Sequence, residues 1–157
     1  MALHSALSCH SPSDAHAASP LEGLRVLVVD DSRETRESLA ALLGLRGVKV
    51  TLADSGIAAL NIVTDLAPDY LPEVLICDIA MPDQDGYVTL SRIREWEARN
   101  DARAPMPAIA FTASALQHEK LKAASYGFNA HLTKPIVPDR LYSALKDMSR
   151  LRSVLTI

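Results

Sequence analysis

Four features that are scarce or absent narrow the classes of protein to which this chain can belong. It has two cysteines in 157 residues, Cys9 in a polar segment and Cys77 in an apolar one, so we expect no disulfide framework and infer a reducing, cytoplasmic location. No apolar run approaches the roughly 20 residues that a membrane-spanning helix needs. No charged segment leads into an apolar core at the start, as a secretory signal requires. A formal net charge of −3 leaves no basic excess for a nucleic-acid or anionic-membrane partner.

The chain does contain a regular alternation of short apolar runs and longer amphipathic stretches. The first run, Arg25–Val29, is rich in β-branched residues, and Val74–Cys77 is continuously apolar, both of which are typical of buried strands. The runs lie at 25–29, 48–52, 74–77, 108–111 and 130–133. Strands that alternate with helices predict an α/β fold, here a five-stranded parallel sheet, doubly wound, in a flavodoxin-like three-layer sandwich.

The folded domain is predicted to span residues 21–149. The preceding segment, 1–20, is rich in Ser, Ala and His without apolar periodicity, and we expect it to be a disordered tail or linker. Residues 150–157 are expected to form a C-terminal stub.

Local signals mark the expected ends of helices and turns. Ser32 is a predicted N-cap, and Ser114 with Gln117 three residues later predicts a capping box. Gly86 is available for an unusual backbone angle. The helix after Gln117 has a thin apolar stripe, so we expect it to be lightly anchored. That stripe comprises Leu116, Leu121 and Ala124.

Chemically active side chains follow four of the five predicted strands. Asp30 and Asp31 follow the first, Asp78 the third, Thr112 the fourth and Lys134 the fifth. The carboxyl ends of parallel strands share one edge of a sheet, where ligands bind in such folds. We therefore expect these side chains to converge, although an aspartate at a strand end can also simply begin a turn.

Three neighbouring carboxylates repel one another and favour a bound cation. Oxygen ligands suit Mg²⁺, and the cluster lacks the His and Cys ligands that zinc favours. A metal, a lysine and a hydroxyl around one carboxylate are what an aspartyl-phosphate site needs, with Asp78 as the nucleophile. The plainer alternative is a structural Lys134–Asp ion pair without phosphate. Cys77 beside Asp78 is interpreted as a buried apolar residue rather than a reactive thiol.

From Leu24 to Leu145 the chain resembles a response-regulator receiver domain of two-component signalling. The matching segments are Leu27–Asp31, Ile76–Pro82 with Asp85 and Gly86, Phe111–Ala113, and Leu132–Pro135. The resemblance implies that the chain is a signalling module rather than an enzyme. Its partners would be a sensor histidine kinase or histidine phosphotransfer protein upstream and an unknown protein downstream.

The resemblance also implies a role for each matching residue. Asp78 would accept a phosphoryl group from a partner histidine. Asp30, Asp31, Asp78 and the backbone carbonyl of Ala80 would hold Mg²⁺. Lys134 would contact the phosphoryl group, Thr112 would swing to hydrogen-bond it, and the Lys134–Pro135 bond would be cis.

Two positions depart from the family pattern. His131 stands where receivers usually have an aromatic residue that turns inward with the hydroxyl. We hypothesise that His131 is the switch residue and that its titration makes the output pH-sensitive; the alternative is an exposed histidine on a strand edge. Ala80 occupies a position that influences how water reaches the acyl phosphate in receivers, so the phosphorylated lifetime is left open.

Two other interpretations compete with this one. A Mg²⁺-dependent phosphatase of the haloacid-dehalogenase-like class also uses an aspartate nucleophile. Such enzymes place two aspartates two residues apart after the first strand, whereas Asp30 and Asp31 are adjacent. The chain also resembles receivers at the C-terminus of hybrid sensor kinases, and a free-standing receiver is equally consistent. The residues after Met148 include only two basic side chains, Arg150 and Arg152, and do not predict a DNA-binding output domain.

Overall fold

Five parallel strands form one sheet in the order β2-β1-β3-β4-β5, which confirms the predicted fold class. The computed structural model describes residues 19–100 and 104–155, so most of the predicted tail lies outside the described part of the chain. The strands are β1 (Arg25–Val29), β2 (Lys49–Ala53), β3 (Val74–Asp78), β4 (Ala108–Thr112) and β5 (Ala130–Thr133).

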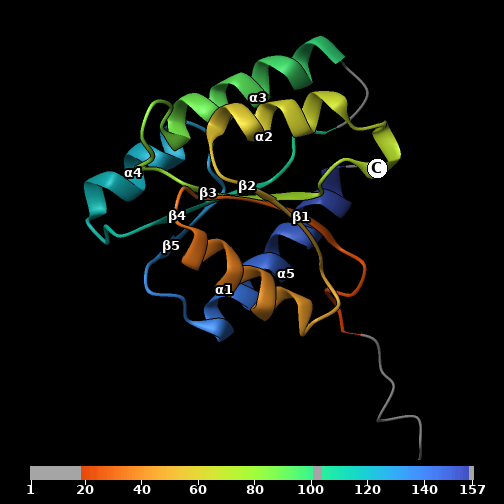
Figure 1. Cartoon of the computed structure of the whole chain (residues 1–157), viewed down its shortest axis with the longest axis horizontal. Coiled ribbons are helices and arrows are strands. Elements are labelled where there is room, and N and C mark those ends of the chain that lie inside the picture. The colour runs from red at the N-terminus through yellow and green to blue at the C-terminus, as the bar shows by residue number, and fades with distance from the viewer. Residues whose placement is uncertain (1–18, 101–103, 156–157) are drawn as a thin grey trace, which may run out of the picture.

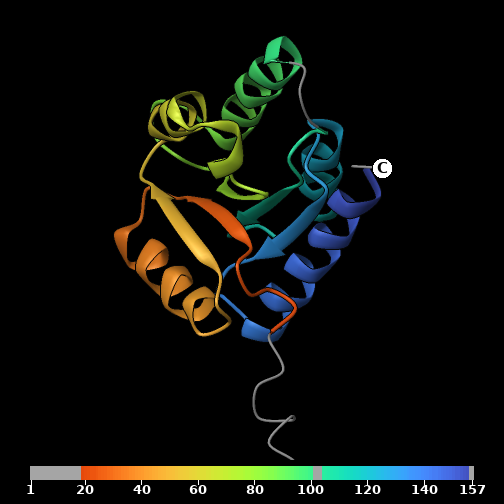
Figure 2. The same cartoon turned by 90° about the vertical axis from the view of Figure 1, so that its right-hand side faces the viewer.

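Helices cover both faces of the sheet in three layers (Figure 1). One layer holds α1 (Arg33–Gly44) and α5 (Pro138–Leu155), and the other holds α2 (Gly56–Asp65), α3 (Gly86–Asn100) and α4 (Gln117–Ser125). A 3₁₀ turn, η1 (Pro68–Tyr70), precedes β3. The view turned by 90° shows the twisted strands between these helices (Figure 2).

Alternate side chains of each central strand enter two separate cores, because successive residues of a strand point to opposite faces. In β1, Val26 and Val28 pack in the core beneath α1 and α5, whereas Leu27 and Val29 pack beneath α2 and α3. All residues of β3 and β4 are buried. Burial on both faces explains why these strands are continuous apolar runs in the sequence.

Serine side chains cap the first two helices. Ser32 Oγ accepts a hydrogen bond from the Thr35 amide at 3.3 Å, as predicted, and Ser55 Oγ accepts one from the Ala58 amide at 3.1 Å. The last helix begins at Pro138, whose missing N–H costs nothing at a first helical turn. It continues to Leu155, through the segment expected to be a stub.

Helix α4 differs from its prediction in two respects. Its N-cap is Leu116, with no side-chain cap, and Ser114 Oγ instead accepts a hydrogen bond from the Leu116 amide, so the capping box is wrong. The predicted stripe is also wrong, since Leu116 and Leu121 are 57% and 62% exposed and only Ala123 within the helix is buried. The helix is therefore lightly anchored, as expected, but through a different residue.

The unusual backbone angle in the β3–α3 loop belongs to Asp83, with φ of 68°, and not to Gly86. Gly86 is required for a different reason: a Cβ there would collide with the carbonyl oxygen of Asp78 and lie 2.9 Å from Cα of Ile79. The glycine lets the start of α3 pass against the end of β3. No helix in the described part of the chain is long and apolar enough to cross a membrane.

Candidate functional site

The structure brings the predicted site residues together at the carboxyl edge of the sheet. Asp78 is the last residue of β3, and Asp30 directly follows β1, the neighbouring strand in the sheet. Thr112 ends β4, and Lys134 directly follows β5. The Lys134 amide donates to the Thr112 carbonyl at 2.7 Å, which ties the ends of these two strands together.

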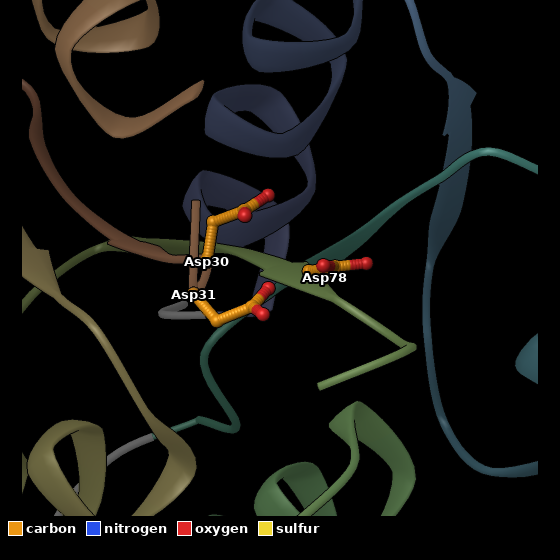
Figure 3. Close-up of side chains that lie close together, drawn as sticks. All are labelled: Asp30, Asp31 and Asp78. Carbon is orange, nitrogen blue, oxygen red and sulfur yellow. The ribbon is translucent and has the colours of Figure 1, made fainter. Parts of the chain in front are cut away.

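Three carboxylates form the acidic part of the site. Asp30, Asp31 and Asp78 each offer an oxygen, and these atoms all lie within 4.8 Å of one another (Figure 3). Asp30 and Asp78 are 1% and 5% exposed, whereas Asp31 is exposed. The site is thus an acidic cluster with two buried members and one exposed member.

Lys134 supplies the positive charge of the site. Its Nζ lies 2.9 Å from Oδ2 of Asp30 and 3.3 Å from Oδ2 of Asp78. The peptide bond between Lys134 and Pro135 is cis, as the resemblance implies. One ammonium thus contacts two carboxylates that come from different strands.

Burial and neighbouring charges shift the pKa values of Asp78 and Lys134. The pKa of Asp78 is raised, first by burial and then by the Asp30 carboxylate, with Lys134 acting in the opposite direction. Burial works against the charge of Lys134, but its contacts with Asp30 and Asp78 outweigh burial and raise its pKa. Negative charge is therefore in excess at the site.

Asp30 provides a test of whether a cation fits this cluster. Its Oδ1 accepts a hydrogen bond from the Ser32 amide at 2.9 Å, but its buried Oδ2 has no aligned hydrogen-bond donor among the described residues and only the Lys134 ion pair nearby. Because the single Lys134 ammonium is shared between Asp30 and Asp78, part of the buried negative charge lacks a compensating cation, which is costly. With two further carboxylates close by, the donor set fits a hard divalent cation such as Mg²⁺.

Ala80, the expected carbonyl ligand, lies in the loop that follows Asp78. Its amide donates to Asp78 Oδ1 at 3.2 Å, which folds the loop back over the carboxylate. Ala80 itself is exposed, whereas Asp78 is buried. Beneath the site, Cys77 is a free buried thiol whose pKa is raised by burial, in keeping with its interpretation as an apolar residue.

Thr112 and His131, the two proposed switch residues, lie on neighbouring strands. Thr112 is buried, and its Oγ1 accepts a hydrogen bond from the Ser114 amide at 3.3 Å. His131 is half-buried rather than exposed, and its buried Nδ1 has no hydrogen-bond partner among the described residues. Burial and then Lys120 lower its pKa, against an opposing effect of Glu119. Both of these charged residues belong to α4.

Two contributors to the site were not identified from the sequence. Arg36, on α1, donates from Nη1 to the backbone carbonyl of Asp30 at 2.8 Å. Gln84, between two aspartates in the β3–α3 loop, is buried and donates to Thr89 Oγ1 at 3.2 Å. Arg36 lies one helical turn beyond Ser32, so its position near the site could have been predicted from the helical period. No local pattern indicates that Gln84 is buried.

Comparisons with known proteins agree with this geometry. Residues 26–146 match the family model of the response regulator receiver domain. An uncharacterized 14.6 kDa protein in the sodA1 3' region of Leptolyngbya boryana is 38% identical over 118 residues, covering 75% of this chain and 84% of that protein. The sensor histidine kinase RcsC of Salmonella typhi is 33% identical over 140 residues, covering 89% of this chain but 14% of the kinase.

Solved structures share the same architecture. Chemotaxis protein CheY4 of Vibrio cholerae superposes with a TM-score of 0.70 at 25% identity, covering 80% of this chain and 98% of that one. A response regulator receiver domain protein from Clostridium thermocellum has a TM-score of 0.73 at 24% identity, covering 85% of this chain and 99% of that one. At this identity, the likeness is evidence for a shared fold only.

The chain belongs to the response regulator receiver domain family. It has the fold of a two-component signalling module, and sequence relatives include segments of much longer sensor kinases.

Proposed function

We propose that this domain accepts a phosphoryl group on Asp78 from a phosphohistidine of a sensor kinase or histidine phosphotransfer protein. The observation that carries the proposal is the convergence of three carboxylates, one lysine and one threonine from four different strand ends. No single strand end would be sufficient, because each residue type alone is common at such positions. The cytoplasm is the proposed compartment, in agreement with the free thiol of Cys77.

The chemistry follows from the charges of the site. A carboxylate oxygen of Asp78 attacks phosphorus, the P–N bond to the imidazole breaks, and the departing nitrogen keeps the electron pair. Asp30, Asp31, Asp78 and the Ala80 carbonyl are the residues that would hold Mg²⁺, which neutralises charge on the transferring group when bound. Lys134 is within reach of Asp78, so its ammonium can contact a phosphoryl oxygen carried there.

The proposed output is a change in the surface around α4. A phosphoryl group on Asp78 would offer new acceptors to the hydroxyl of Thr112, at the neighbouring strand end. His131 is proposed as the switch residue, since its half-buried ring lies near Glu119 and Lys120 of α4. The light anchoring of α4 through Ala123 supports a movable element there, whose equilibrium phosphorylation would shift.

Intact-mass spectrometry after incubation with acetyl phosphate and Mg²⁺ tests the proposal. The wild-type chain is expected to gain one phosphoryl group, and the Asp78→Asn variant none. Omission of Mg²⁺, or Lys134→Met, should reduce the gain strongly. A wild-type chain that gained no phosphoryl mass under these conditions would refute the proposal.

A turnover assay with p-nitrophenyl phosphate separates this function from an aspartate-dependent phosphatase. The adjacent placement of Asp30 and Asp31, with the third aspartate on β3, favours the receiver. We therefore expect no sustained release of p-nitrophenol. Continuous turnover that Asp78→Asn abolished would favour the phosphatase.

A further inference from the structure

The loop between β3 and α3 contains a buried polar pair whose role the site description leaves open. Gln84 is 7% exposed, and its Nε2 donates a hydrogen bond to Oγ1 of Thr89 at 3.2 Å. Thr89, on α3, is completely buried. Its hydroxyl donates to the Asp85 carbonyl at 2.9 Å, so its oxygen remains free to accept from Gln84. The two hydrogen bonds fix the direction of the Gln84 amide.

Helix α2 leaves room for this pair at its first residue, Gly56. A Cβ on Gly56 would collide with both Oγ1 of Thr89 and Nε2 of Gln84. The amide and the hydroxyl thus fill the space that the glycine leaves open. Gln84 therefore connects three elements: the loop after the phosphoacceptor, the first turn of α3 and the start of α2.

The same loop holds the expected ligand carbonyl of Ala80. The two ends of this loop are joined at Ile79. Its carbonyl accepts hydrogen bonds from the backbone N–H of Met81 at 3.2 Å and from that of Gly86 at 2.8 Å. Gln84 lies in the part of the loop that returns toward α3, and its backbone N–H donates to the Pro82 carbonyl at 2.7 Å. Because the loop is closed on itself, holding Gln84 also restrains the part that contains Ala80.

We infer that the Gln84–Thr89 hydrogen bond positions the β3–α3 loop, and with it the Ala80 carbonyl, for divalent-cation binding. Gln84 is then a positioning residue that acts through the loop without touching the cation. This inference rests on the proposed function, because it concerns the same acidic site. It predicts that loosening Gln84 weakens cation binding while the three aspartates remain intact.

Isothermal titration of Mg²⁺ into the purified protein tests the inference. Gln84→Met keeps an unbranched side chain of similar length but cannot donate, and it should raise the Mg²⁺ dissociation constant about two- to tenfold, as expected for one lost hydrogen bond. Thr89→Val should raise it as well, whereas Thr89→Ser keeps the hydroxyl and should preserve wild-type affinity. In the Thr89→Val background, Gln84→Met should add little, because the bond is already lost.

Gln117→Met is the matched control, since Gln117 is the only other glutamine of the chain and is exposed on α4. Equal Mg²⁺ affinities for Gln84→Met and Gln117→Met would overturn the inference. If Gln84→Met does not fold, the comparison of Thr89→Val with Thr89→Ser decides the question in the same way.

Amide hydrogen exchange without Mg²⁺ separates this inference from the proposed function. Exchange across residues 79–85 should be faster in Gln84→Met than in the wild type, with no change in β1 or α5. A wild type that binds no Mg²⁺ would overturn the proposed function. Unchanged loop exchange in Gln84→Met would overturn the positioning role of the pair.

Discussion

Lys134 Nζ lies 2.9 Å from Oδ2 of Asp30, although the two residues are separated by most of the chain. The contact joins the end of β5 to the end of β1, which are not neighbours in the sheet. Asp78 lies between them on β3, and Lys134 contacts it at 3.3 Å. One ammonium balances part of the charge of a cluster in which the pKa of Asp78 is nevertheless raised. This excess negative charge leads to the first prediction.

Replacement of Asp78 by Asn should stabilise the protein in the absence of Mg²⁺. Burial and Asp30 raise the pKa of Asp78, so the folded chain holds this proton more tightly than the unfolded chain does. Stability is therefore lost as the pH rises above the ordinary aspartate pKa of 3.8, and the loss is complete once the pH exceeds the folded pKa. We expect Asp78→Asn to increase the free energy of unfolding at pH 7.

The difference in stability between the two proteins should narrow as the pH falls, and it should vanish below the ordinary aspartate pKa of 3.8, where the carboxyl is neutral in both states. Added Mg²⁺ should also narrow it, by offsetting repulsion in the wild type. Urea unfolding with EDTA or Mg²⁺ measures both effects. A variant less stable than wild type at pH 7 in EDTA would contradict the prediction.

Replacement of His131 by Phe should reduce the loss of folding stability that the wild type shows as the pH falls. Burial and Lys120 lower the pKa of His131, so the unfolded chain takes up this proton first. The wild type should then lose stability as the pH falls below about 6.5, the ordinary histidine value. His131→Phe removes that loss.

Thermal unfolding between pH 8 and pH 5 is the measurement for this variant. His118→Phe, on the exposed surface of α4, is the matched control for replacing histidine by phenylalanine. Equal slopes for His131→Phe and the wild type would show that the ring contributes nothing to the pH dependence.

An alanine at Gly86 should destabilise the fold. The added Cβ would collide with the Asp78 carbonyl, which is backbone and cannot rotate away. We expect a loss of about 1–3 kcal/mol, as for other overpacked sites. Gly44→Ala is the control, because a Cβ at the end of α1 meets no atom within 4 Å. It should be neutral or stabilising by up to about 1 kcal/mol. Chemical denaturation that ranked the two variants in the opposite order would refute the close approach.

Removal of the Tyr142 hydroxyl should weaken the contact between α5 and α1. This hydroxyl donates to the Leu42 carbonyl at 2.8 Å, and Arg46 lies over the Tyr142 ring at 4.4 Å. Tyr142→Phe keeps the ring and should cost about 0.5–1.5 kcal/mol. Tyr70, which is 69% exposed, provides the control, and Tyr70→Phe should change stability by less than about 0.5 kcal/mol. Similar denaturation midpoints for the two variants would argue against the hydroxyl contact.

Helix α4 should exchange its amide protons faster than α1. Within α4 only Ala123 is buried, and no side chain caps its N-terminus, whereas α1 buries Leu39 and Leu43 and is capped by Ser32. Few buried contacts lower the free energy of local opening. Hydrogen exchange followed by mass spectrometry should show this difference without phosphorylation. Equal protection of the two helices would mean that α4 is no more movable than its neighbours.

The five strands, the chemical groups at their ends and the class of fold could all be derived from the amino-acid sequence. These features depend on short-range patterns: β-branched runs identify strands buried on both faces, and a parallel sheet brings their carboxyl ends to one edge. Asp30, Asp78 and Lys134 could therefore be assigned to one site before any distance was known. The resemblance to receiver domains added the expected role of each of these residues.

The three-dimensional fold was needed to show which backbone segments approach one another and which polar atoms become buried. The need for glycine at position 86 arises from the Asp78 carbonyl, and the burial of Gln84 arises from Gly56 and Thr89. The side of α4 that faces the sheet was also misassigned, because a helix with few apolar residues has a weak periodic signal. The first two features arise from contacts between different elements of the fold, and periodicity within one segment contains no information about such contacts.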